Sequence, residues 1–235
     1  MITRAVVVPH PPLLVPELVP GSVESTAAVR EACVAAAVRL AEAAPNWIAV
    51  GAGPRWETIG PGVCGSFRGY GVDVPVSLSA GPAAGPTADL PLPVLVAGWL
   101  RAQAGAGSVR AELLPAGASP ADCAETGTRL ARADGDLGLL VLGDGSYRHG
   151  PSAPGSADER AGDFDAKVAA ALAGADADAL LAIEPELAAE LGAVGRAPWQ
   201  VLAGLARAAP GWHGELRYSA APFGVAYHVA VWERS

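Results

Sequence analysis

The chain has 235 residues, 51% of them hydrophobic, and a formal net charge of −8. This length suits one large α/β domain, and the apolar share is sufficient for a core. Lysine and arginine form no basic block in the sequence, so we expect neither a nucleic-acid partner nor an anionic membrane, since both require clustered cationic side chains.

The sequence shows no pattern of a membrane span or a secretory signal. The mean hydropathy is +0.30, but no apolar run reaches the roughly eighteen residues of a spanning helix. The first residues lead directly into a predicted strand. The cysteines, Cys33, Cys64 and Cys123, lack the CxxC spacing of a zinc site and do not form a disulfide framework. We therefore expect a cytoplasmic protein with reduced thiols.

Strand and helix patterns alternate in the first half of the chain. Short apolar runs predict strands, and apolar residues at helical spacing predict helices. The predicted elements are a strand at Ala5–Val8, a helix at about Val23–Ala43, strands at Trp47–Val50 and Val72–Leu78, a loop rich in proline and glycine at Gly81–Pro93, and a helix at about Val94–Ala104.

The second half continues the alternation and ends in two strands. Ser119, Pro120 and Asp122 have the spacing of a capped helix start, and Ser156 with Glu159 has that of a capping box. The predicted elements are a strand at Arg110–Leu114, a helix to about Ala133, a strand at Leu137–Leu142, a helix after Ser156, two short helices within Asp176–Leu191, a helix at Trp199–Ala208, and strands at Glu215–Ser219 and Val225–Trp232. We therefore predict one α/β domain over residues 1–235, with a central mostly parallel or mixed sheet, flanking helices and a C-terminal strand pair.

The most informative segment follows the first strand and reads Val8-Pro9-His10-Pro11-Pro12-Leu13-Leu14-Val15-Pro16-Glu17. Open α/β sheets bind their ligands at the carboxyl ends of the strands, where His10 is expected. Prolines on both sides restrict the backbone, so the imidazole is held in place. Such a histidine suits a metal site or a general acid or base, and a turn in which it bonds only to the backbone is the alternative.

Polar residues follow two further strands. The segments are Gly53-Pro54-Arg55-Trp56 and Asp144-Gly145-Ser146-Tyr147-Arg148-His149. Because the carboxyl ends of parallel strands meet at one edge of a sheet, these groups could share one crevice with His10. Each also has a structural alternative: Arg55 can pair with Glu57 at the surface, Asp144 can cap a turn, and the Tyr147 ring can pack.

Other common catalytic patterns are absent from the sequence. There is no GxSxG, HExxH, Walker A or strand-linked GxGxxG motif. His213 lies in a predicted loop and is expected to face solvent. His228 lies in the last predicted strand, where a structural role is favoured.

Several segments resemble the catalytic B-subunit fold of the class III extradiol ring-cleavage dioxygenases, a fold that the MEMO proteins share. The resemblance begins with the first strand and the segment around His10. It continues in Gly143-Asp144-Gly145-Ser146, in Ala153-Pro154-Gly155 through Phe164-Asp165, and in Ala221-Pro222-Phe223-Gly224-Val225-Ala226-Tyr227. It covers most of the chain and is closest to an uncharacterised actinobacterial branch. The resemblance implies a central sheet with flanking helices and a site at the strand ends.

In ring-cleaving members, the resemblance implies ferrous iron held by two histidines and one glutamate. His10 matches the first histidine. Arg55 stands where the second is expected, and a guanidinium has no lone pair to donate. Near Trp199 the positions expected for the glutamate hold glycine and alanine, and Glu190 is the nearest acid. Compared with the family, the iron ligands are incomplete unless Asp144, His149 or Glu57 substitutes.

The resemblance also implies an acid–base histidine after the strand Leu137–Leu142. There Tyr147 follows Ser146, and His149 comes two residues later. A fixed cation at Arg55 repels a metal dication, but its planar fork can bind a carboxylate.

Two hypotheses follow from the sequence. The first is an enzyme of this superfamily with altered chemistry. In one version, His10 is a catalytic group and a ligand of iron or another divalent metal. In the other, His10 acts without metal, together with Tyr147 or His149. Its small anionic ligand, aromatic or carboxylate, is contacted by Arg55, Trp56, Asp144, Ser146 and Arg148. The second is a non-catalytic ligand-binding or subunit-partner protein. An apolar strand at Val225–Trp232, if it lies at a sheet edge, favours a homo-oligomer, and a small accessory subunit stays open.

Overall fold

Seven strands form one sheet in the computed structural model, which describes residues 1–81 and 87–235. Their order is β3-β6-β2-β7-β1-β9-β8. The strands are β1 (Arg4–Val8), β2 (Asn46–Gly53), β3 (Glu57–Ile59), β6 (Ser108–Pro115), β7 (Leu137–Leu142), β8 (Trp212–Ala220) and β9 (Tyr227–Arg234). The predicted α/β fold, with a mixed central sheet and a C-terminal strand pair, is confirmed.

The centre of the sheet is parallel and its two sides are antiparallel. β1 and β2 both run parallel to β7, and β2 runs parallel to β6. β3 pairs antiparallel with β6, β9 with β1, and β8 with β9. β1, β2 and β7 read as nearly continuous apolar runs because helices cover both faces of the sheet.

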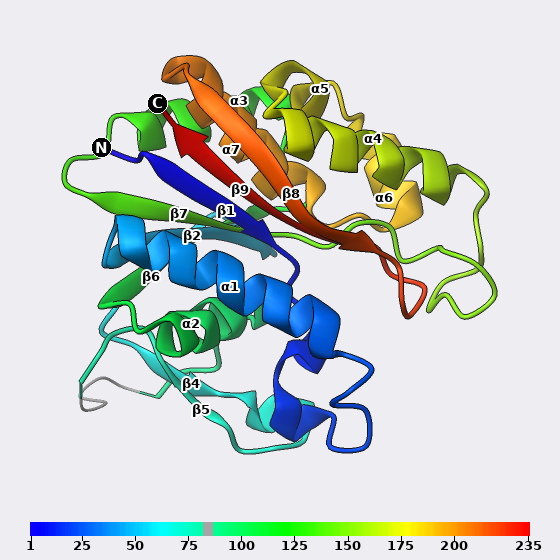
Figure 1. Ribbon diagram of the computed structural model, residues 1–235, viewed down its shortest axis with the longest axis horizontal. Coiled ribbons are helices and arrows are strands. Elements are labelled where there is room, and N and C mark those ends of the chain that lie inside the picture. Colours follow the sequence, from blue (N-terminus) through cyan, green and yellow to red (C-terminus); the bar gives the residue numbers. More distant parts are fainter. Residues whose placement is uncertain (82–86) are drawn as a thin grey trace.

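Helices cover the two faces unequally (Figure 1). One face carries α1 (Ala27–Ala43) and α2 (Leu92–Ala104). The other face carries α3 (Pro120–Ala131), α4 (Arg160–Gly174), α5 (Ala177–Leu181), α6 (Pro185–Leu191) and α7 (Arg196–Ala208). Alternating side chains of β1 divide the core accordingly: Val6 and Val8 pack with α1, whereas Ala5 and Val7 pack on the α7 side.

Short elements lie outside this sandwich. The 3₁₀ turns η1 (Pro12–Leu14) and η2 (Pro16–Leu18) follow β1, and each begins at a proline. A small antiparallel sheet is formed by β4 (Cys64–Ser66) and β5 (Pro75–Ser77), which the 3₁₀ turn η3 (Phe67–Tyr70) connects. The strand predicted at Val72–Leu78 is therefore shorter than expected and does not join the central sheet. Part of the loop predicted at Gly81–Pro93, residues 82–86, lies outside the described residues.

Of the two helix caps predicted from the sequence, one is present in the structure and one is not. Ser119 caps α3, since its side chain accepts a hydrogen bond from the Asp122 backbone N–H. The capping box predicted at Ser156 and Glu159 is wrong. α4 begins at Arg160, and Glu159 is the N-cap residue without a side-chain cap bond. The chain after Ser156 first continues as a loop, so Ser156 is too far from the helix to cap it.

The last strands correct the predicted sheet edge. The predicted strand Val225–Trp232 corresponds to β9, which lies between β1 and β8 and has no free edge. The outer strand is β8, where alternate residues are exposed. The edge argument for a homo-oligomer therefore fails, because the apolar strand is paired on both sides.

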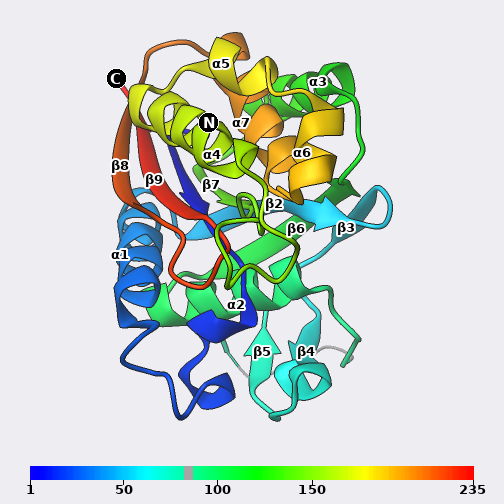
Figure 2. The same ribbon diagram turned by 90° about the vertical axis from the view of Figure 1, so that its right-hand side faces the viewer.

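The carboxyl ends of β1, β2, β6 and β7 meet at one edge of the sheet, which faces the viewer in Figure 2. The segments after these strands contain the residues that the sequence singles out as candidates. None of the helices in the described residues has the length and apolarity needed to cross a membrane.

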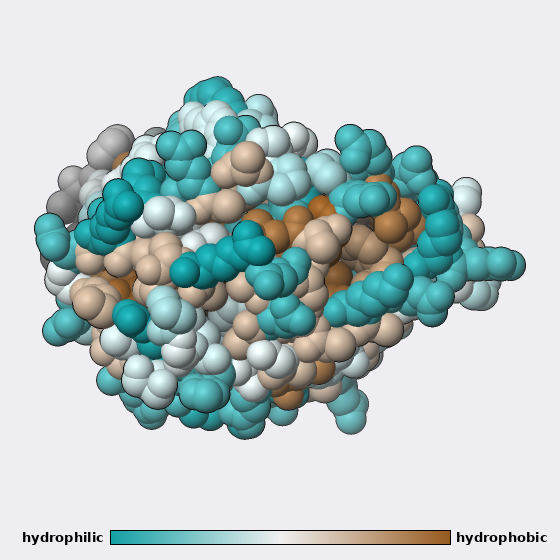
Figure 3. Space-filling view, turned by 90° about the horizontal axis from the view of Figure 1, so that it is seen from above, coloured by the Kyte–Doolittle hydropathy of each residue, from teal (hydrophilic) through white to brown (hydrophobic). Residues whose placement is uncertain are grey.

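The helical layer on the α7 side is uneven at its surface. A cavity of about 450 Å³ lies between α4 and the α5–α6 segment and is lined mainly by apolar side chains, with Lys167 and Glu184 among them. Figure 3 looks down on this side and shows apolar residues in hollows between hydrophilic ones.

Candidate functional site

His10 and Asp144 lie together at the ends of neighbouring parallel strands. Val8 of β1 is paired with Leu142 of β7, so residues two positions later on each strand meet. The His10 backbone N–H donates a hydrogen bond of 2.8 Å to Asp144 Oδ1, and the His10 ring Nδ1 is 3.6 Å from the same oxygen. The predicted proximity of these two residues is therefore present in the structure.

The surroundings of this pair are largely buried. His10 is only 7% exposed, and its Nδ1 has no hydrogen-bond partner among the described residues. Burial raises the pKa of the Cys33 thiol on α1, and the Asp144 charge raises it further. Burial and then Asp144 also raise the pKa of the Tyr227 phenol on β9. His10, Asp144, Cys33 and Tyr227 form what we call the α1-side group.

A second group is centred on Asp165 of α4. One carboxylate oxygen, Oδ2, is 2.6 Å from His149 Nε2, and the other, Oδ1, is 3.1 Å from His228 Nε2. The Ser146 backbone N–H also donates to this carboxylate, at 3.2 Å to Oδ2. Asp165 is 5% exposed, so its charge is compensated by these donors rather than by water. Asp165, His149, His228 and Ser146 form the Asp165 group.

The hydrogen-bond pattern assigns the histidine tautomers. The ionised Asp165 carboxylate can only accept, so both Nε2 atoms carry the proton. His228 Nδ1, 3.0 Å from Ser219 Oγ, then accepts the hydroxyl proton. His149 Nδ1 is left with a lone pair, and the side chain keeps 21% of its surface exposed. An imidazole oriented by a buried carboxylate with its second nitrogen available is the arrangement of a general base.

The chain segment that carries His149 is held against the start of β9. Backbone hydrogen bonds run from Gly145 N–H to Ala226 O, from Ala226 N–H to Ser146 O, and from His149 N–H to Gly224 O. These bonds place His149 above Asp165 without support from regular secondary structure. The ring position is consequently determined by contacts between segments far apart in the sequence.

The two groups lie on opposite faces of the sheet. Tyr227 and Cys33 pack in the core on the α1 side. The His228 ring instead lies 6.1 Å from the Trp199 ring of α7, whose side chain belongs to the other core. Consecutive residues of β9 point to opposite faces, so Tyr227 and His228 separate the two groups. The single crevice predicted from the sequence is divided in the structure.

The other residues of the segment after β7 have packing contacts. Ser146 is fully buried, and its hydroxyl donates to Leu191 O at 2.9 Å. The Tyr147 ring packs so closely on Gly192 that a Cβ there would lie 1.7 Å from it. The Arg148 guanidinium carbon is 5.8 Å from the centre of the Tyr147 ring. These contacts favour a structural role for Tyr147, and its predicted catalytic role stays a prediction.

Arg55 and Trp56 lie beyond the end of β2 and point to other partners. The Arg55 guanidinium is 3.1 Å from Glu57 Oε2 and the side chain is 70% exposed. No hydrogen bond or ion pair joins it to His10 in the described part of the chain. It lines a separate cavity of about 480 Å³ with Glu57 and Asp89. Trp56 is half-exposed. The surface pairing that the sequence allows as the alternative for Arg55 is therefore present.

The donor set does not fit the iron site implied by the resemblance. Arg55 offers no lone pair, and Glu190 is exposed and pairs with Arg160 at 2.8 Å. Over residues 1–81 and 87–235, no three His, Cys, Asp or Glu side chains are placed to hold a metal ion. His10 has Asp144 beside it but no further ligand of the required kind.

Sequence reasoning missed the role of Asp165. The sequence nevertheless contains a sign of this role, because Asp165 lies within the apolar stripe of α4. The buried residues of this helix include Ala161, Phe164, Asp165, Val168 and Leu172. A carboxylate at such a position needs partners. His228, for which a structural role was favoured, is indeed buried and hydrogen-bonded at both ring nitrogens.

Comparisons with known proteins show the fold alone. No protein-family model and no curated protein matches the chain. Among solved structures, the uncharacterized protein JW3007 from Escherichia coli K12 is similar over 98% of this chain and 99% of its own, with a TM-score of 0.55 and 13% sequence identity. The central sheet and its flanking helices therefore occur in a second protein of nearly the same extent.

Proposed function

We propose that the chain is an extradiol dioxygenase-like protein that binds a small anionic ligand, aromatic or carboxylate, at the strand ends and uses His149 as its acid–base group without iron. The observation that carries the proposal is the 2.6 Å contact between His149 Nε2 and the buried Asp165 carboxylate. It leaves Nδ1 as the basic atom and stabilises the imidazolium once Nδ1 has taken a proton.

The residues around His149 would stabilise a proton that this side chain takes from a ligand. Asp165 accepts hydrogen bonds from both imidazoles, while Ser219 donates to Nδ1 of His228. A proton taken from a ligand by His149 Nδ1 therefore resides on a ring whose positive charge faces a carboxylate. The same group can return the proton to the product.

The proposal leaves out iron chemistry and a nucleic-acid partner, and it includes a cytoplasmic location. Ring cleavage through iron is not part of the proposal, because the ligand set does not assemble. The buried cysteines are all unpaired thiols, for which the reducing cytoplasm is the compartment that we propose. The net charge of −8 gives no support to a nucleic-acid partner.

The test combines ligand binding with oxygen uptake. The probe is 3,4-dihydroxybenzoate, an anionic catechol, added to protein purified without oxygen, with and without ferrous iron. We expect the His149 ring signals in an NMR spectrum to shift on titration, with no stoichiometric iron binding and no oxygen uptake. His149→Gln should weaken binding at least about five-fold, since a charge-assisted contact is lost.

The controls separate the alternatives. His213→Gln alters an exposed histidine on β8 and should leave binding unchanged. Oxygen uptake that depends on iron and disappears in His10→Ala would restore the dioxygenase function. Unshifted His149 signals with 3,4-dihydroxybenzoate would contradict the proposed ligand site.

A further inference from the structure

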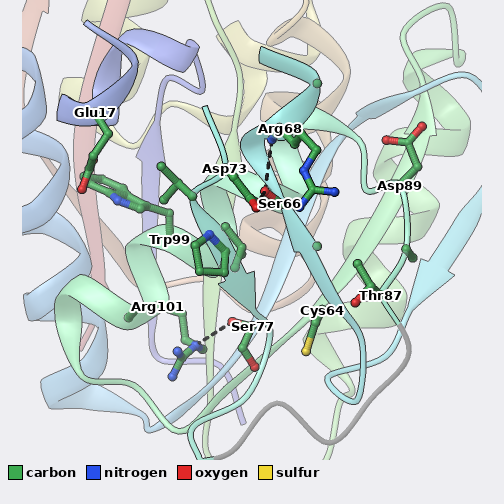
Figure 4. Close-up of a pocket in the computed structure, with 18 of the residues that line it drawn as sticks. Glu17, Cys64, Ser66, Arg68, Asp73, Ser77, Thr87, Asp89, Trp99 and Arg101 are labelled. Atoms are coloured by element: carbon green, nitrogen blue, oxygen red, sulfur yellow. Dashed lines mark hydrogen bonds and ion pairs between the residues drawn. The ribbon is translucent and has the colours of Figure 1, made fainter. Parts of the chain in front are cut away.

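A further cavity lies away from the strand-end groups. It has a volume of about 980 Å³ and is bounded by α2, the small β4–β5 sheet and the turn η2 (Figure 4). Neither His10 nor His149 lines it. Its lining combines apolar side chains, among them Trp99 and Val76, with one deeply buried arginine, Arg101.

Arg101 is buried without an acidic partner. The side chain is 8% exposed, and none of the ion pairs in the described residues includes it. Its Nε donates to Ser77 O at 3.1 Å and its Nη1 to Ala106 O at 2.8 Å. A guanidinium has five N–H donors, so these two carbonyls leave donors unused, Nη2 among them. Burial lowers the pKa of Arg101, because it removes the charged guanidinium from water.

The sequence explains why the arginine is held there. Gly98, one turn earlier on α2, lets the helix approach β5 so closely that a Cβ would lie 2.4 Å from Val76 Cγ1. This contact brings Arg101 against the carbonyl of Ser77. Arg101 also bonds the carbonyl of Ala106 just beyond the helix end, where a cation is favourable. The guanidinium is thus fixed before any ligand arrives.

The acidic residues of the cavity do not neutralise Arg101. Asp73 is paired with Arg68 at 2.5 Å and accepts a hydrogen bond from Ser66. Figure 4 shows Arg101 and Ser77 at one end of the view, whereas Glu17, Asp73 and Asp89 lie toward the other end. One end of the cavity therefore carries an uncompensated positive charge next to apolar walls.

We propose that this cavity is a second binding site, independent of the strand-end site, for a small organic carboxylate with a flat apolar body. The planar guanidinium matches a carboxylate in a two-point contact. The apolar body would lie against the side chains of Trp99, Pro75 and Val76, which line the cavity. An inorganic anion such as phosphate satisfies the charge but makes no use of these walls.

The test titrates the full-length protein with benzoate by calorimetry, with the Trp99 indole NMR signal as a local readout. We expect saturable binding in the wild type and at least a ten-fold higher Kd in Arg101→Met, which keeps the apolar stem of the side chain and removes the charge. Benzyl alcohol, which has the same ring without the charge, should bind at least ten-fold more weakly. Arg68→Met, at an exposed arginine that lines the same cavity, should change the Kd less than three-fold.

The alternatives have distinct results. Absent benzoate binding, or an equal Kd in Arg101→Met, would overturn the proposal, and so would tighter binding of inorganic phosphate. If Arg101→Met does not fold, Arg101→Lys decides, because it keeps the charge and loses the fork: an unchanged Kd would contradict the two-point contact. His149→Gln should leave benzoate binding here intact, so failure at the strand ends and failure at this cavity are distinguishable.

Discussion

The two polar groups at the strand ends differ in how their buried charge is compensated. In the α1-side group, Asp144 accepts one backbone N–H of His10, and the ring Nδ1 of His10 has no hydrogen-bond partner within residues 1–81 and 87–235. In the Asp165 group, the carboxylate accepts from two imidazoles and a backbone N–H. Of the two groups, only the second has a carboxylate bound to one imidazole nitrogen while the other nitrogen is left for a ligand. General acid–base catalysis needs an imidazole held in this way.

The difference indicates that a rigid backbone does not by itself determine how a histidine ring is oriented. Prolines on both sides fix the backbone of His10, but its ring is almost fully buried, with the Asp144 carboxylate beside it. His149 lies in an irregular segment, and its ring is oriented by a partner on a different helix. A catalytic group depends on the second residue that orients it, and such a residue can lie anywhere in the sequence.

The largest effect is expected for Asp165→Asn. The amide replaces one acceptor oxygen with a donor, so an imidazole N–H is left facing an N–H. We expect a loss of about 3–5 kcal/mol in unfolding free energy and a Tm lower by roughly 6–20 °C in thermal melts. Asp144→Asn is the matched control, because its Oδ1 still accepts from His10, and it should cost about 1 kcal/mol or less. Equal losses in the two variants would show that the Asp144 and Asp165 carboxylates contribute equally to stability.

An alkaline titration sharpens the description of the α1-side group. Burial raises the pKa of Cys33 far above its ordinary value and that of Cys123 to about 11. Above about pH 9 the unfolded chain loses these protons while the folded chain keeps them, so stability falls as the pH rises. We expect a decrease of about 1 kcal/mol for each thiol between pH 9 and 10, measured by urea unfolding.

Cys33→Ala provides the control for this titration. It should remove about half of the combined thiol contribution to the slope and leave that of Cys123. A slope that Cys33→Ala leaves unchanged would show that the Cys33 thiol is not held in its neutral form beside Asp144.

The smallest effect is expected for Arg55→Gln. The exposed pair with Glu57 contributes less than about 0.5 kcal/mol, so the unfolding free energy should barely change. The Kd of 3,4-dihydroxybenzoate at the strand ends should also stay within about two-fold, because no hydrogen bond or ion pair in the described residues joins Arg55 to either group. A ten-fold weaker binding in this variant would return Arg55 to the ligand-binding role that the sequence suggests.

The elements that sequence patterns predict well are those whose residues contact near neighbours. Ser119 and Asp122 cap α3 within one turn, and the two short helices predicted within Asp176–Leu191 are present as α5 and α6. The apolar runs of β1, β2 and β7 were predicted because a strand buried on both faces needs no alternation. Val72–Leu78 was overestimated, since a short run has the same composition whether it joins the main sheet or a separate pair of strands.

The candidate site was predictable only in part. His10 and Asp144 meet because parallel neighbours bring equivalent positions together, which the sequence pattern anticipates once both strands are recognised. The link between His149 and Asp165 depends on how α4 packs over the loop after β7, and sequence spacing carries no information on that. Arg101 could not be singled out either, because its lack of an acidic partner is visible only when its neighbours are known.

The sequence by itself determined the α/β class and the strand ends that carry polar residues. Local periodicity and side-chain chemistry suffice for these conclusions. The tertiary structure alone decided on which face of the sheet each polar residue lies, which carboxylate orients which imidazole, and where a buried cation meets a cavity. These outcomes depend on contacts between distant segments, where the cost of burying an unpaired charge selects the partner.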